Sequence, residues 1–139
     1  MPTPATILVV DDHELVRRSL HSLLGQEHHW TVYEAVNGED ALASALKVRP
    51  NVVVMDIVMP EMSGIEATYE MRRLLPEVRI ILMSSYYTPE EAAHLARLFG
   101  DGNFIEKAAI GNELIPVVSR LLAEQSGAII EERAEAVFT

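Results

Sequence analysis

The sequence contains no cysteine, which excludes disulfide bonds and thiolate metal sites. It also lacks a long apolar run near its N-terminus. The first apolar run, residues 7–10, is far too short for a signal peptide or a membrane span. A chain of 139 residues is long enough for one domain with an ordinary core and too short for two. We therefore expect a soluble, cytoplasmic protein with one domain at residues 1–125 and a C-terminal tail or linker at 126–139.

Basic residues are scarce: 11 Lys and Arg stand against 21 Asp and Glu, and the formal net charge is −10. No stretch concentrates enough Lys or Arg to offset this charge, which repels the phosphates of nucleic acids. We expect no direct nucleic acid binding by this chain. Acidity alone is usually a solubility feature, so it indicates a site only where several acids converge.

Short apolar runs alternate along the chain with longer segments of helical periodicity. The runs are residues 7–10, 31–35, 52–55, 80–83 and 103–105. Most are rich in Val and Ile and lack polar alternation, which is typical of strands buried on both faces of a parallel sheet. The predicted fold class is therefore α/β: a (βα)5 doubly wound, five-stranded parallel sheet with helices on both faces.

Two helix starts carry capping signals, Ser63 with Glu66 and Thr88 with Glu91. The last helix is harder to delimit, because Pro116 would interrupt its hydrogen bonding. We expect that helix to begin late, near Asn112, or to bend at the proline.

Polar side chains follow four of the apolar runs, where ligands bind in parallel α/β sheets. These side chains are Asp11, Asp12, Asp56, Ser84 or Ser85, and Lys107. Each has an ordinary explanation alone: a helix cap, a solvated loop residue, a turn residue or a surface charge. Their convergence on one edge of the sheet is harder to explain without a site.

Three carboxylates packed within about 4 Å would repel one another by several kcal/mol. A hard divalent cation such as Mg²⁺ relieves that repulsion and still accepts phosphate oxygens. Lys107 and a serine hydroxyl can then bind the remaining phosphoryl oxygens, as phosphoryl transfer requires. A carboxylate nucleophile that forms an aspartyl phosphate fits this arrangement.

Three stretches carry a family resemblance: residues 9–13 (VVDDH), 55–64 (MDIVMPEMSG) and 104–107 (FIEK). Together they resemble the receiver domains of two-component response regulators, and the similarity runs from about residue 6 to residue 122. Residues 10–17 (VDDHELVR) and 76–79 (PEVR) are most similar to receivers that are joined to a C-terminal helix-turn-helix domain.

The resemblance implies a flavodoxin-like strand order 2-1-3-4-5 and a phosphorylation-driven conformational switch. By matching positions, Asp56 is the phosphoacceptor for a sensor histidine kinase or a phosphotransfer protein, and a phosphorylation-dependent homodimer is one output. The Mg²⁺ ligands are Asp11, Asp12, Asp56 and the backbone carbonyl of Val58. Lys107 binds the phosphoryl group, and Phe104 is the switch aromatic.

The hydroxyl position has two candidates. Counting along the fourth strand selects Ser84, whereas counting back from Lys107 with the family's usual spacing selects Ser85. We prefer Ser84, because strand length constrains it directly and the following loop absorbs an insertion cheaply. A second departure from the family pattern is Ala108, which stands where the family often has a proline with a cis bond.

Other functions share parts of this pattern. A phosphatase of the haloacid-dehalogenase type has a second Asp two residues after its nucleophile, and this Asp acts as the general acid. This chain has Val58 at that position, so it lacks the proton donor that such a phosphatase needs for turnover. A nucleotide or flavin module needs a glycine or hydroxyl cradle after the first strand, where this chain has Asp-Asp-His-Glu. Another alternative is a receiver that binds partners without being phosphorylated. It is disfavoured because all five site groups are present. We expect a phosphoacceptor rather than an enzyme.

Overall fold

A computed structural model describes residues 4–99 and 102–138, with the backbone alone for Phe99 and for 126–138. Its five strands form one parallel sheet in the order β2-β1-β3-β4-β5. The strands are β1 (Ala5–Val10), β2 (Trp30–Ala35), β3 (Val52–Asp56), β4 (Arg79–Ser84) and β5 (Asn103–Glu106). Fold class and strand order are both confirmed, and each predicted run lies within a strand.

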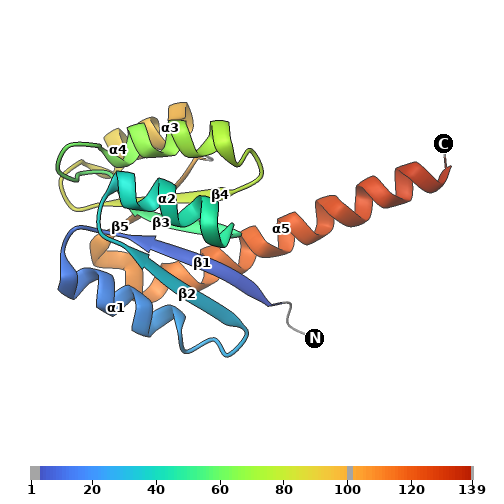
Figure 1. Cartoon of the computed structure of the whole chain (residues 1–139), viewed down its shortest axis with the longest axis horizontal. Helices are drawn as coiled ribbons and strands as arrows, with labels where there is room; N and C mark the ends of the chain where they lie inside the picture. Colours follow the sequence, from blue (N-terminus) through green and yellow to red (C-terminus); the bar gives the residue numbers. More distant parts are fainter. Residues whose placement is uncertain (1–3, 100–101, 139) are drawn as a thin grey trace.

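Helices follow the strands in strict alternation and cover both faces of the sheet (Figure 1). They are α1 (Glu14–Leu24), α2 (Gly38–Val48), α3 (Gly64–Leu74), α4 (Pro89–Phe99) and α5 (Ile110–Phe138), the last preceded by a 3-10 turn at Lys107–Ala109. None of the helices in the described part of the chain combines the length and the apolar character that a membrane crossing needs.

Alternate residues of each central strand serve two separate cores. Leu8 and Val10 of β1 belong to the cluster under α2, α3 and α4, whereas Ile7 and Val9 belong to the cluster under α1 and α5. All four side chains are fully buried. Because both faces of the strand are covered, the sequence shows a continuous apolar run instead of polar alternation.

Both predicted helix caps are present. Ser63 Oγ accepts a hydrogen bond from the Glu66 N–H at 3.2 Å at the start of α3. At the start of α4 the box is reciprocal: Thr88 Oγ1 accepts from the Glu91 N–H, and Glu91 Oε1 accepts from the Thr88 N–H. These bonds satisfy backbone donors that a helix start would otherwise leave unpaired.

The last helix starts close to the expected position. The helix α5 begins at Ile110, two residues before Asn112, and includes Pro116. The 3-10 turn at Lys107–Ala109 leads directly into α5, which allows this earlier start. The helix continues to Phe138 and extends beyond the sheet (Figure 1). The division into a domain at 1–125 and a tail at 126–139 stays a prediction.

The loop between β3 and α3 folds back onto the end of β3 at Gly64. The Gly64 N–H donates to the Ile57 carbonyl at 2.8 Å, and a Cβ on Gly64 would lie only 2.1 Å from the Asp56 carbonyl oxygen. That oxygen belongs to the backbone and cannot move aside without shifting β3. Only glycine therefore allows α3 to start this close to Asp56.

Replacement of Gly64 by alanine should lower the free energy of unfolding by about 1–3 kcal/mol, because the added methyl group overpacks a backbone contact. Urea denaturation measures this loss. The matched control is Gly111→Ala, since no atom lies within 4 Å of the added Cβ in α5. This control should keep or raise stability, by at most about 1 kcal/mol. Equal stability of Gly64→Ala and the parent would contradict the close contact.

Candidate functional site

Three strands deliver charged residues to the carboxyl edge of the sheet. Asp11 follows β1 directly, Asp56 is the last residue of β3, and Lys107 follows β5. The pairing of Val10 with Met55 in the β1–β3 register brings Asp11 beside Asp56. Lys107 reaches both carboxylates from across the end of β4. The structure thus brings these three predicted residues together.

Lys107 bridges the two carboxylates. Its Nζ lies 3.0 Å from Asp11 Oδ2 and 3.1 Å from Asp56 Oδ2. The side chains of Asp11 and Asp56 are 0% and 4% exposed, and that of Lys107 is 17% exposed. Burial lowers the pKa of Lys107, but its contact with Asp11 and the charge of Asp56 outweigh burial and raise that pKa above its usual value. The ammonium is therefore held charged between two acids.

Asp56 is the residue of this group whose negative charge is least favoured. Burial raises its pKa, the neighbouring charge of Asp11 raises it further, and Lys107 opposes both without cancelling them. The Val58 N–H donates to Asp56 Oδ1 at 3.3 Å. The ionised form of Asp56 is thus disfavoured in the folded site and gains from any added positive charge.

Asp11 is held in place by contacts that sequence reasoning missed. Its Oδ1 accepts a hydrogen bond from the His13 N–H at 2.9 Å. Arg17 donates through Nη1 to the Asp11 carbonyl at 2.9 Å and through Nε to Glu34 Oε1 at 2.9 Å. The signal in the sequence was the arginine one turn into α1, which lies on the helix face toward β1 and β2.

A divalent cation fits the acidic side of the site. Ligand atoms of Asp11, Asp12, His13 and Asp56 lie within 4.8 Å of one another. Asp11 Oδ2 is buried and shares the Lys107 ammonium with Asp56, so one positive charge faces two buried carboxylates. Carboxylate oxygens are the ligands that hard cations prefer, so the donor chemistry suits such an ion. Asp12, which was also considered as a helix cap, is not one, because His13 is the N-cap residue of α1.

The two serine candidates differ in environment. Ser84 is the last residue of β4 and is 1% exposed, whereas Ser85 is exposed. Ser84 Oγ accepts hydrogen bonds from the N–H groups of Tyr86 at 3.0 Å and Tyr87 at 3.4 Å. Phe104 is half-buried in β5 and packs with Tyr87 against the core under α4.

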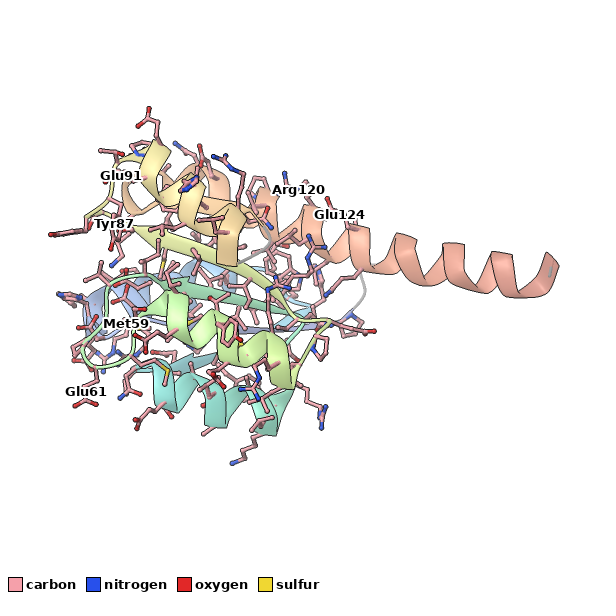
Figure 2. The ribbon with its side chains drawn as sticks, turned by 90° about the horizontal axis from the view of Figure 1, so that it is seen from above. Met59, Glu61, Tyr87, Glu91, Arg120 and Glu124 are labelled. Carbon is pink, nitrogen blue, oxygen red and sulfur yellow. The ribbon has the colours of Figure 1, made fainter. Side chains whose placement is uncertain are left out.

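Two loops border this end of the molecule (Figure 2). One carries Met59 and Glu61 between β3 and α3, and the other carries Tyr87 and leads to Glu91 at the start of α4. Among the described residues no peptide bond is cis, so Ala108 follows Lys107 in the ordinary trans form.

Comparisons with known proteins agree with this architecture. Residues 7–119 match the response regulator receiver domain family. The chain is 31% identical over 121 residues to the response regulator protein VraR of Staphylococcus epidermidis, and 30% identical over 115 residues to VraR of Staphylococcus aureus. These matches cover 86% and 82% of this chain but only 57% and 54% of the relatives, so it spans just over half their length.

Solved structures give the same result. A LuxR-family two-component response regulator from Aurantimonas sp. superposes with a TM-score of 0.81 at 28% identity, over 95% of this chain and 99% of the other. The receiver domain of a response regulator named NarL from Mycobacterium tuberculosis gives 0.77 at 28% identity, over 86% and 96%. The chain therefore belongs to the response regulator receiver domain family of two-component signal transduction.

Proposed function

We propose that Asp56 accepts a phosphoryl group from the phosphohistidine of a sensor histidine kinase or a phosphotransfer protein. The observation that supports this most directly is the Lys107 ammonium, 3.1 Å from Asp56 Oδ2 at the open end of the sheet. A cation beside the attacking carboxylate can neutralise a phosphoryl oxygen during transfer and in the product.

The transfer requires one bond to form and one to break. A carboxylate oxygen of Asp56 attacks the phosphorus, the P–N bond to the donor histidine breaks, and the leaving nitrogen keeps the electron pair. Mg²⁺ held by Asp11, Asp12, Asp56 and the Val58 carbonyl would neutralise the phosphoryl oxygens that Lys107 does not contact. Val58 provides no side-chain acid for rapid hydrolysis, so this chain acts as a phosphoacceptor rather than a phosphatase.

Phosphoramidate has a P–N bond like that of phosphohistidine and tests the acceptor directly. With Mg²⁺ present, intact-mass measurement should show one added phosphoryl group on the parent and none on Asp56→Asn, which lacks the nucleophilic carboxylate. Glu61→Gln is the matched control, because it removes an exposed carboxylate from the adjoining loop and should label normally. Normal labelling of Asp56→Asn would disprove the assignment.

Ser84 is suited to detect the new phosphoryl group. In the described residues its oxygen only accepts hydrogen bonds, from Tyr86 and Tyr87, so its own proton can be donated to a phosphoryl oxygen. Movement of Ser84 toward Asp56 would pull the Tyr86–Tyr87 backbone with it and open space for Phe104 to turn inward. A full switch from 1:99 to 99:1 needs about 5.5 kcal/mol in favour of the active state.

Replacement of Ser84 by alanine should leave phosphorylation of Asp56 intact but suppress the conformational response. The hydroxyl that links the phosphoryl group to the loop is then missing. The measurement is the change in Phe104 and Tyr87 NMR signals on phosphorylation. Ser85→Ala is the matched control and should respond like the parent. The opposite pattern would assign the role to Ser85.

The phosphorylated state should be long-lived compared with fast-cycling receivers. Hydrolysis needs a water aligned behind the phosphorus, and a group that positions it is typically worth about 10²–10⁴-fold in rate. The side chains expected to flank that approach are Val58 and Tyr86, and neither bears a carboxylate or amide. Both stand at the surface, 45% and 78% exposed, where they can shield the phosphoryl group.

Val58→Asn should therefore accelerate phosphate loss, by up to about 10²-fold, since an amide at this position can orient the water. Release of phosphate from the purified phosphoprotein measures the rate. Val36→Asn is the matched control: Val36 is 46% exposed but follows β2, and its replacement should leave the rate unchanged. A parent lifetime of seconds, or an unchanged rate in Val58→Asn, would contradict the explanation.

A further inference from the structure

We propose that His13 is an additional ligand of the cation, and that its imidazole gives this site a preference for divalent transition ions over Mg²⁺. The inference rests on the metal site included in the proposed function, and it adds a nitrogen donor to that site.

The position of the ring supports this role. His13 Nδ1 lies 3.4 Å from Asp12 Oδ1 and 3.5 Å from Asp11 Oδ1. A ligand atom of His13 also lies within 4.8 Å of a carboxylate oxygen of Asp56. Ligands on opposite sides of an ion bound at about 2.1 Å are separated by about 4.2 Å, so small adjustments suffice to close this group around one ion.

The side chain of His13 has no role in capping α1. His13 is the N-cap residue of α1, yet its side chain makes no capping hydrogen bond. The side chain is 71% exposed and lies on the open rim of the site beside Asp12, which is 28% exposed. An imidazole at this position is available to bind an ion that enters from solvent.

The floor of the site provides a second, independent observation. Asp11 is fully buried, and its Oδ2 lies 3.0 Å from the Lys107 ammonium, which Asp56 shares. One ammonium shared by two buried carboxylates leaves a net negative charge, and a bound cation relieves the cost of burying that charge. The buried Asp11 and the exposed His13 thus belong to the same group of ligand atoms.

The donor set determines which ion is preferred. Carboxylate, carbonyl and water oxygens suit Mg²⁺, whereas imidazole nitrogen suits iron, nickel and zinc. Affinity for a mixed nitrogen and oxygen site rises along the first transition row toward copper. Loss of the imidazole should therefore weaken transition-ion binding much more than Mg²⁺ binding.

The test compares Co²⁺, as a spectroscopic stand-in for such ions, with Mg²⁺ by isothermal titration of the full chain. His13→Ala should weaken Co²⁺ binding about tenfold or more, the range seen when a metal site loses a supporting group, and Mg²⁺ binding less than about twofold. His94→Ala removes another exposed histidine, on α4, and should change neither affinity. Because the His13 side chain makes no capping bond, the thermal midpoint without metal should stay unchanged.

A second measurement detects the bond itself. The NMR spectrum of the Co²⁺-bound parent should contain a strongly shifted imidazole N–H signal that is absent from His13→Ala. Equal weakening of both metals, or no weakening of Co²⁺, would overturn the role of His13 and leave the Mg²⁺ site standing. Failure of the parent to bind either ion would overturn the inference together with the metal site of the proposed function.

Discussion

The bridge from Lys107 to Asp11 and Asp56 is the interaction on which the site depends. Two buried carboxylates side by side, one directly after β1 and one at the end of β3, repel each other by about 4 kcal/mol at 4 Å and an effective dielectric of about 20. Lys107 opposes that repulsion from the end of β5, at 3.0 and 3.1 Å. Burial and the charge of Asp11 together raise the pKa of Asp56, and Lys107 offsets them only in part. The fold therefore holds Asp56 in a position where Lys107 compensates its negative charge only in part.

This imbalance is useful for accepting a phosphoryl group. Three carboxylates and one ammonium carry a formal charge of −2, which one divalent cation cancels. Conversion of Asp56 to an acyl phosphate replaces the single negative charge of its carboxylate with about −1.5 to −2 charges at the same position. The excess must be met by hydrogen-bond donors from residues not yet committed, and the Ser84 hydroxyl has a free proton. In the proposed function, the same electrostatics that favours a cation would thus make the site responsive to phosphorylation.

The sequence was informative about this molecule wherever a local rule determined the outcome. Apolar runs marked the strands, the capping boxes marked α3 and α4, and strand ends located Asp56 and Lys107. It was uninformative where the outcome depended on how elements pack. The bond from Arg17 to the Asp11 carbonyl depends on the rotation of α1 against the sheet, and the contact of Gly64 with Asp56 depends on the path of a loop. Neither contact produces a pattern in the sequence from which it could be predicted.

The site has a buried floor and an exposed rim, and this asymmetry fixes how a signal can leave it. Asp11 and Asp56 are closed in by the sheet, so a change of charge there cannot be relieved by a movement of the strands themselves. The part that can yield is the loop after β4, which is tied to Ser84 through the Tyr86 and Tyr87 N–H groups. Tyr87 and Phe104 pack against the same core cluster, so in the proposed switch a shift of this loop would change the packing of β5. In the proposed function, a charge added at the end of β3 would thereby change the surface two strands away, at β5.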